Sequence, residues 1–523
     1  MKHRHAAKLE IKKRLDRETG TIQKSAAIRV AMVYPSPYRV GMSSLGFQTI
    51  YRILNGREDV VAQRAFLPDD VDTYRKHRIP LMCYESLQPV GESDIFAVSL
   101  SYETEVLGLI ACLELAGMPL RAIDRDQGWP LVLLGGPITF SNPLPVAPFC
   151  DIVVMGEADE VLDRILDLWS DSNDKESFLE RAGVLPGIYV PSLHGEKLVQ
   201  VGQSADSRLP AFSQIITPDT ELSNMHLVEN ARGCHRGCTF CVMRRTTNGG
   251  MRTVSVERVL ETIPPYAKRV GLVGAATTDH PQILDILRGI VETGREVGLS
   301  SLRADRLNDE FVGLLAQGGV RTLTVASDGA SERLRKIARK GIRAEHLLQA
   351  AAFVRDKGLK TLKVYVVIGY PEEEDHDIEE MISLFEELAA ICPVALGISP
   401  LVAKKNTPLD GVDFQDERML RKRIQKIRRR LGKRVDIRST SVRWAWVEYQ
   451  IAQGGWDMAA VAEDVYKNGG NHAAWRTAIE KLEPTTAPVV RPASDRIKTG
   501  ALLNPAIRKR DREAPVDRRE GAG

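Results

Sequence analysis

The sequence has no apolar run long enough to cross a bilayer, and aromatic residues make up only 6% of its 523 residues. A membrane-spanning helix needs about 20 consecutive apolar residues, so none is predicted. The basic segment 1–24 lacks the apolar stretch of a signal peptide. A net charge of +3 is too small to indicate a polyanionic partner for the whole chain. We therefore expect a cytoplasmic protein without membrane association.

Cysteine is scarce as well, with seven residues, four of them scattered singly. We expect each single cysteine to pack as a small apolar residue and not to bind a metal. The four single positions are Cys83, Cys112, Cys150 and Cys392.

The other three cysteines stand together in Ala-Arg-Gly-Cys-His-Arg-Gly-Cys-Thr-Phe-Cys, as Cys234, Cys238 and Cys241. Four thiolates normally complete a four-iron cluster, so three leave one iron free to bind a small molecule. The alternative is zinc with His235 as the fourth ligand, but zinc sites usually add a second ligand pair some way off. No second pair exists in this sequence. The spacing therefore favours a four-iron, four-sulfur cluster on these three cysteines.

The length predicts about three domains. The two ends are polar or rich in Pro and Arg, and we expect them to be disordered. Pro, Gly and Ser between residues 185 and 220 indicate a linker with at most one hairpin. The predicted parts are a basic tail 1–25, an α/β domain 26–184, a linker 185–220, a second α/β domain 221–400, a helical domain 401–483 and a tail 484–523.

Short apolar runs alternate with helical stretches in the first α/β domain. This pattern predicts a doubly wound parallel sheet with helices on both faces. Ligands of such sheets bind at the carboxyl ends of the strands, near a topological switch point. The predicted strands are 28–33, 60–67, 95–100, 131–134 and 152–155.

The same alternation returns after the cysteines, with a repeat of about thirty residues. Six such units fit a partial (β/α)6 barrel whose active site lies at the carboxyl ends of the strands. The cysteines follow the first of these strands. The predicted strands are 225–230, 270–273, 299–302, 322–325, 362–368 and 395–398.

Residues 401–483 are predicted to be helical and to act as a lid. Leu420, Ile424, Ile427 and Leu431 recur at helical spacing and define an apolar face. The opposite face is basic and is most often a solvated surface; RNA is the weaker interpretation, because no aromatic residues are interleaved. The basic residues are Arg421, Lys422, Arg423, Arg428, Arg429 and Arg430.

The cysteine motif, the preceding strand and Phe240 resemble the signature of radical S-adenosylmethionine (SAM) enzymes. The resemblance implies a cluster that is reduced by a single-electron carrier such as flavodoxin or ferredoxin and that cleaves SAM to a 5′-deoxyadenosyl radical. It also implies SAM contacts near the strand ends. Asp328 stands where relatives commonly have glutamate, and Gly274-Ala275 is an incomplete copy of the usual glycine pair. The implied SAM contacts are Phe240, Gly274, Ala275, Arg303, Asp328, Ile368 and Gly369.

The strand ends of the first domain, in their order ahead of the cysteines, resemble the cobalamin-binding domains fused to such enzymes. Many cobalamin domains carry a histidine that binds the cobalt, but none occurs between His5 and His77. The resemblance therefore implies cobalamin without a histidine ligand, or else a relic domain that holds substrate. The implied cobalamin contacts are Ser99, Ser101, Gly135, Gly136, Gly156 and Glu157.

Together these features predict a radical SAM enzyme that performs cobalamin-assisted methylation, or a related modification, of an unactivated carbon. One alternative is a cobalamin-independent radical SAM enzyme acting on RNA or protein. Another is a non-catalytic iron–sulfur sensor associated with nucleic acid. The substrate does not follow from the sequence.

Overall fold

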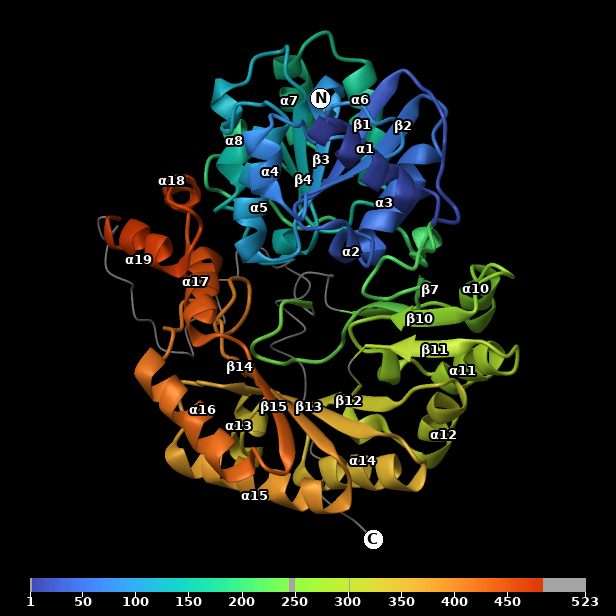
Figure 1. Cartoon of the computed structure of the whole chain (residues 1–523), viewed down its shortest axis with the longest axis vertical. Helices are drawn as coiled ribbons and strands as arrows, with labels where there is room; N and C mark the ends of the chain where they lie inside the picture. Colours follow the sequence, from blue (N-terminus) through green and yellow to red (C-terminus); the bar gives the residue numbers. More distant parts are fainter. Residues whose placement is uncertain (1, 244–249, 301, 483–523) are drawn as a thin grey trace.

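A computed structural model describes residues 2–243, 250–300 and 302–482 of the chain. In Figure 1 an N-terminal α/β domain lies above a partial barrel, and the last helices run up beside the N-terminal domain. Among the described residues, no helix is both long and apolar enough to cross a membrane.

The N-terminal domain is built on a six-stranded sheet of order β2-β1-β3-β4-β5-β6. Its first five strands are parallel, as the sequence predicts, and β6 is antiparallel to β5. The order changes direction at β1 and β3, so the domain is doubly wound. The strands are β1 (Ile28–Tyr34), β2 (Val60–Phe66), β3 (Ile95–Ser99), β4 (Leu131–Gly135), β5 (Ile152–Val154) and β6 (Ile188–Tyr189).

Helices cover both faces of this sheet because its strands are apolar on both sides. One face packs against α1, α3, α6 and α7. The other packs against α5. The helices are α1 (Lys2–Leu15), α2 (Tyr38–Gly41), α3 (Leu45–Asn55), α4 (Val71–Lys76), α5 (Val106–Leu115), α6 (Val161–Ser170), α7 (Lys175–Gly183) and α8 (Pro191–His194).

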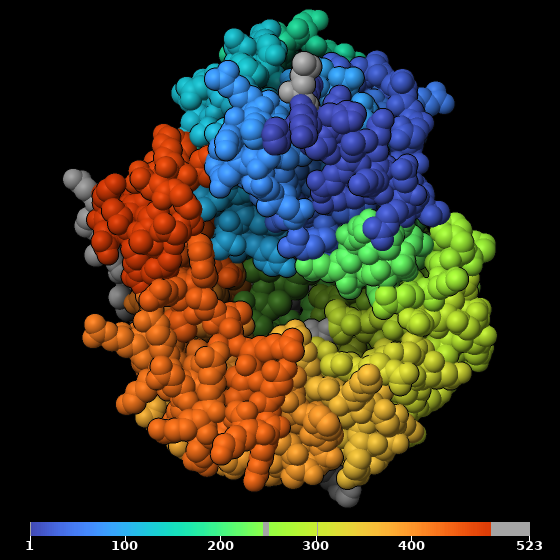
Figure 2. Space-filling view, viewed as in Figure 1, coloured from blue at the N-terminus to red at the C-terminus, as the bar shows by residue number. Residues whose placement is uncertain are grey.

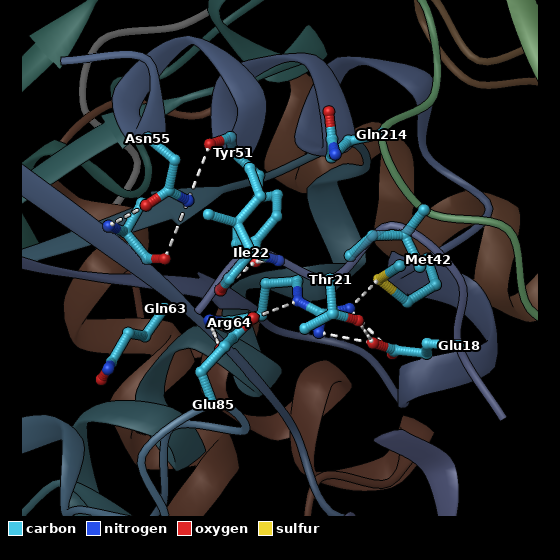
Figure 3. A network of polar contacts seen from close by, with 12 residues as sticks. Glu18, Thr21, Ile22, Met42, Tyr51, Asn55, Gln63, Arg64, Glu85 and Gln214 are labelled. Carbon is cyan, nitrogen blue, oxygen red and sulfur yellow. Dashed lines mark hydrogen bonds and ion pairs between the residues drawn. The ribbon is translucent and has the colours of Figure 1, made fainter. Parts of the chain in front are cut away.

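The expectation of a disordered N-terminal tail is wrong. Helix α1 buries Ala7 and Ile11, which lie four residues apart and so share one face. The segment that follows brings Glu18 to Arg64 of β2, which is completely buried, with an ion-pair distance of 2.8 Å. Glu85 pairs with the same guanidinium at 2.6 Å (Figure 3). The polar composition of residues 1–25 concealed this packing because its key contact is a buried ion pair.

The segment 185–220 is more ordered than a linker. It supplies β6, and Gly202 forms a backbone bridge with Gly156. Leu209 and Ile215 are buried. This segment therefore completes the edge of the N-terminal sheet. The predicted tail 484–523 lies outside the described residues.

The barrel contains the six predicted parallel strands and a seventh. Two sheets, β11-β10-β7 and β12-β13-β14-β15, meet at a single bridge between Leu302 and Val325. A short antiparallel pair, β8 and β9, surrounds the cysteine loop. The strands are β7 (Met225–Glu229), β8 (Ala231–Gly233), β9 (Met251–Thr253), β10 (Arg269–Val273), β11 (Glu296–Leu299), β12 (Thr322–Ala326), β13 (Thr361–Ile368), β14 (Val394–Pro400) and β15 (Val435–Ser439).

Helices pack on the outside of the barrel strands and form its hydrophobic core. In α16 the predicted apolar face is buried, but Arg423, expected on the charged face, is buried too and pairs with Glu373 at 2.6 Å. The helices are α10 (Val256–Glu261), α11 (Ile283–Val291), α12 (Asp309–Gln317), α13 (Glu332–Ile337), α14 (Ala344–Asp356), α15 (Asp375–Ile391) and α16 (Glu417–Leu431).

The C-terminal region is not a separate helical domain. Strand β15 adds to the barrel sheet, parallel to β14. Helices α17 (Val442–Gln453), α18 (Asp457–Lys467) and α19 (His472–Glu480) contribute to the core of the N-terminal domain beside α5 (Figure 1). Asn142 fixes this contact by donating to the carbonyls of Ala452, at 3.0 Å, and Gly454, at 2.8 Å. The chain thus returns to its first domain and ties the two domains together.

Candidate functional site

A cavity of about 390 Å³ lies at the carboxyl ends of β1, β3, β4 and β5. Five of the six predicted cobalamin contacts line it: Ser99, Gly135, Gly136, Gly156 and Glu157. Ser101 is outside the set of lining residues. Its hydroxyl lies 2.8 Å from the Tyr34 hydroxyl, and its N–H donates to Glu105 at 2.7 Å.

The opposite wall of the cavity comes from the second half of the chain. Glu229, Arg232, Met243 and Val273 line it. Arg232 and Met243 flank the three cysteines in sequence. The cavity therefore joins the strand ends of the N-terminal domain to the neighbourhood of the cysteine loop.

Glycines in the cavity wall fall into two kinds. A Cβ added at Gly135 or at Gly46 would meet no atom within 4 Å, so at these points the backbone faces open space. Gly136 and Gly156 have φ near +100°, and a Cβ there would lie 2.5 Å from the Leu100 and Gly202 carbonyl oxygens, respectively. Gly136 and Gly156 are required by their turns, because other residues rarely adopt a positive φ of this size. The first kind leaves room for a large ligand to approach the backbone, so the wall fits a corrin ring.

Arg232 links the two walls electrostatically. Its guanidinium pairs with Asp159 at 2.8 Å, Glu157 at 3.1 Å and Glu229 at 2.8 Å. Glu157 also pairs with Arg252 of β9 and accepts from the Ser204 N–H at 3.1 Å. Glu157 is thus engaged in protein contacts and helps to position the cysteine loop.

The cysteine loop follows β8 and is held by the turn after α13. The Thr239 N–H donates to the Ala338 carbonyl at 3.0 Å, and Cys238 lies 3.8 Å from the Arg339 carbonyl. Arg236 forms two hydrogen bonds with Asp279, at 2.9 and 2.8 Å. The loop is thereby fixed to the barrel on both sides of Cys238.

Burial raises the pKa of the Cys241 thiol to about 11, and its neighbours Cys238 and Cys234 add to the effect. Burial also raises the pKa of Cys238, against the nearby cations Lys340 and Arg303. The three sulfurs thus lie close enough to influence one another. Iron would replace the protons, because metal binding requires thiolates.

His235, the fourth ligand of the zinc alternative, has an acidic neighbour in this structure. His235 faces Asp279, with 3.7 Å between Nε2 and the carboxylate. Within the described parts of the chain, no three His, Cys, Asp or Glu side chains converge as ligands of a single ion. A four-iron cluster binds each thiolate to a different iron, so its ligands are spaced more widely.

Two of the predicted SAM contacts, Asp328 and Arg303, lie near this loop. Asp328 and Arg303 both contribute to the electrostatic environment of Cys238. Asp328 pairs with Lys340 at 2.6 Å, and Arg303 pairs with Asp305 at 3.0 Å and donates to the Lys340 carbonyl at 2.9 Å. Both side chains are therefore held by protein partners.

Of the remaining predicted contacts, Phe240 belongs to the cysteine loop and the others lie at strand ends. Phe240 packs against the barrel core, and Ala275 is exposed. A Cβ at Gly274 would lie 2.9 Å from Asn230 Oδ1, so this turn is tightly packed. At the end of β13, Ile368 is buried, while Gly369 has φ +90° and donates its N–H to Glu373 at 3.0 Å.

Sequence reasoning missed two residues of this site. Arg232 was visible two residues before Cys234, but its partners in the N-terminal domain are distant in sequence. Lys340 lies in the turn after α13, and only the fold brings it to Asp328. Neither residue belongs to a motif with a recognisable spacing.

Two family models match this chain. Residues 46–191 match the model described as radical SAM proteins, N-terminal, and residues 229–385 match that of the radical SAM superfamily. Together the matches cover more than half of the chain. The chain belongs to the radical SAM superfamily. This confirms the predicted family and enzyme class, along with the four-iron cluster and SAM that the superfamily uses.

Several relatives resemble this radical SAM enzyme in sequence. An uncharacterized protein of Methanocaldococcus jannaschii is 24% identical over 416 residues, which span 78% of this chain and 85% of that protein. An uncharacterized methyltransferase of Pyrococcus horikoshii is 24% identical over 312 residues, 57% of this chain and 67% of that protein. The ribosomal protein uS12 methylthiotransferase RimO of Thermotoga maritima is 24% identical over 177 residues, 31% of this chain and 41% of RimO.

A solved structure shares the fold. The radical SAM methyltransferase TsrM of Kitasatospora setae, with cobalamin and a 4Fe–4S cluster bound, matches with a TM-score of 0.55. The match covers 88% of this chain and 100% of that chain at 13% identity. It confirms the predicted fold class, a doubly wound sheet followed by a radical SAM barrel and a helical C-terminal region.

Proposed function

We propose that this radical SAM enzyme performs cobalamin-assisted methylation, or a related modification, of an unactivated carbon. The observation that carries the proposal is the cavity shared by the strand ends of the N-terminal domain and by Arg232, Met243 and Val273 of the barrel side. A corrinoid bound there would lie beside the cysteine loop.

In this proposal Cys234, Cys238 and Cys241 hold a four-iron cluster. When bound, the cofactors supply an electron that cleaves SAM to a 5′-deoxyadenosyl radical, and a methyl group carried by cobalamin. The protein positions the reactants and excludes water from the radical. The apolar wall formed by residues such as Met32, Leu45, Val154 and Leu162 suits the second task.

Corrinoid binding is proposed to occur without a histidine ligand to cobalt. The described residues that line the cavity include no histidine. Gly46 and Gly135 offer the open backbone at which a large ring can approach. Ser99, Gly136 and Gly156 belong to the same wall and complete the proposed contact surface, with Glu157 acting through Arg232.

SAM is proposed to lie between the cysteine loop and the ends of β10, β12 and β13. Phe240, Gly274, Ala275 and Gly369 would contact it mainly through backbone and ring surface. Asp328 and Arg303 would present charges at fixed positions to SAM, because protein partners already hold both side chains. A single-electron reductant of the flavodoxin or ferredoxin type would complete the system.

The test is anaerobic reconstitution with iron, sulfide and hydroxocobalamin, followed by metal and corrinoid quantitation and an assay for 5′-deoxyadenosine. We expect about four irons per chain, retained corrinoid and SAM cleavage. Cys234→Ala, Cys238→Ala and Cys241→Ala should each lose the cluster. The matched control is Cys392→Ala, a buried cysteine away from the site, which should keep it.

Two outcomes would redirect the proposal. Iron and SAM cleavage without corrinoid would favour cobalamin-independent chemistry on RNA or protein, which the methylthiotransferase relatives support. Iron without cleavage would favour the non-catalytic sensor. Full iron content in a cysteine variant would contradict the ligand assignment.

A further inference from the structure

Several lumen-facing positions of the barrel strands hold small residues. Alternate residues of most barrel strands are buried and apolar and pack against the helices, so the intervening residues face the lumen. Closed barrels fill this space with large branched side chains. This barrel is partial, and Figure 2 shows a recess between it and the N-terminal domain. The small lumen-facing residues are Gly271, Gly298, Thr324, Ala326, Ala395, Gly397 and Ser399.

The lumen glycines let large side chains of the neighbouring strands lie across the sheet. A Cβ at Gly271 or Gly298 would come within 2.6 to 2.7 Å of Met225. A Cβ at Gly397 would lie 2.6 Å from the ring of Tyr365, its partner in the parallel register of β13 and β14. These glycines are therefore required by the flat placement of Met225 and Tyr365.

Tyr365 and Lys363 face the lumen from strand β13. Tyr365 is 37% exposed, although it lies in the middle of a sheet. The Lys363 ammonium stands 4.7 Å from the centre of its ring. Across the described residues no carboxylate pairs with Lys363, and Asp436, two strands away in the same register, is paired with Arg438 at 2.9 Å.

We propose that Lys363 and Tyr365 form a subsite that holds an anionic group of the substrate, a carboxylate or a phosphate. The Lys363 ammonium, which has no carboxylate partner among the described residues, and the Tyr365 hydroxyl supply two donors to such a group. The exposed ring edge offers apolar contact to the part of the substrate next to it. The role of Lys363 and Tyr365 as a substrate subsite rests on the proposed radical chemistry, whereas their binding of an anion does not.

The subsite would orient the substrate toward the site. The Tyr365 carbonyl accepts from the N–H groups of Ser327 and Asp328, at 2.9 and 3.2 Å, so it lies directly below the turn that carries Asp328. Lumen-facing positions two residues apart are about 7 Å apart along a strand. An anion held at Lys363 would therefore place the rest of the substrate toward Gly369 and the cysteine loop.

The test is calorimetric titration of the full chain with benzoate, phenyl phosphate and neutral benzyl alcohol. We expect saturable binding of at least one anion and weakening by about tenfold or more in Lys363→Met, the size expected for a charged hydrogen bond. Lys363→Arg should restore binding, and Tyr365→Phe should weaken it less than Lys363→Met. The control Lys422→Met removes an exposed lysine of α16 and should change nothing. Which anion binds distinguishes carboxylate from phosphate.

Equal affinities in the wild type and Lys363→Met, or saturation by neither anion, would overturn the subsite. SAM cleavage is measured on the same preparations after reconstitution. SAM cleavage without anion binding would overturn the subsite and leave the proposed function standing. Anion binding without cleavage supports the subsite and overturns the proposed function.

Discussion

The guanidinium of Arg232, two residues before Cys234, lies 2.8 Å from the carboxylate of Asp159 in the N-terminal domain. The side chain of Arg232 is only 13% exposed. The proposed cluster ligands are thus tied directly to the wall of the proposed corrinoid cavity. A shift of one domain would move both cofactor sites together.

Arg232→Met should uncouple these sites. It leaves the buried carboxylates of Asp159 and Glu229 without their partner, which costs about 3 kcal/mol for a buried pair. We expect lower corrinoid retention and slower SAM cleavage, although the substitution leaves all three cysteines in the sequence. The measurement is urea unfolding combined with corrinoid quantitation. Arg208→Met, whose partner Asp163 is partly exposed, should cost less than about 1 kcal/mol; equal effects of the two variants would argue against the link.

Gly135→Val should block the cavity without unfolding the protein. The added side chain meets no atom within 4 Å of its Cβ position and would project into the proposed corrin site. We expect an almost unchanged melting temperature and a large loss of corrinoid after reconstitution. Gly136→Ala is the contrast, because its Cβ would lie 2.5 Å from the Leu100 carbonyl. That variant should lose about 1–3 kcal/mol of stability. Normal corrinoid content in Gly135→Val would contradict the assigned cavity.

Glu18→Gln tests the N-terminal segment. Glu18 and Arg64 are both buried, and the substitution removes one of the two carboxylates that neutralise the guanidinium. We expect a loss of about 2 kcal/mol in the free energy of unfolding. Glu10→Gln, which changes an exposed partner of Arg14, serves as the control. Similar stabilities for both variants would mean that residues 1–25 contribute little.

His226 should make the folded state sensitive to acid. Burial lowers its pKa from the usual 6.5 to about 4. The unfolded chain therefore binds a proton that the folded chain resists, and stability falls as the pH drops from 6.5 toward 4. The shift of about 2.5 units corresponds to ~3 kcal/mol at pH 4. His226→Phe should remove this part of the pH dependence in chemical unfolding. His5→Gln, at an exposed position, should leave the profile unchanged; a wild-type profile in His226→Phe would contradict the prediction.

Local sequence patterns were sufficient to predict those elements whose structure depends on one buried face or on one apolar period. The apolar runs predicted the parallel strands of both domains, because buried strands need continuous apolar sequence. The apolar spacing of Leu420, Ile424, Ile427 and Leu431 predicted the buried face of α16. Helix α1 was missed, since its docking depends on the Glu18–Arg64 pair and not on apolar content. Strand β15 was missed because its exposed alternate residues Asp436 and Arg438 make a short polar segment.

By itself the sequence determined the family, the order of the two α/β domains and the three cysteines, because these depend on short motifs and on the periods of strands and helices. Only the tertiary structure decided that α17–α19 complete the first domain's core, that Arg232 joins the cysteine loop to Asp159, and that Lys363 lies over the ring of Tyr365. The reason is physical: each of these contacts joins residues far apart in the chain, and their meeting depends on the packing of whole elements.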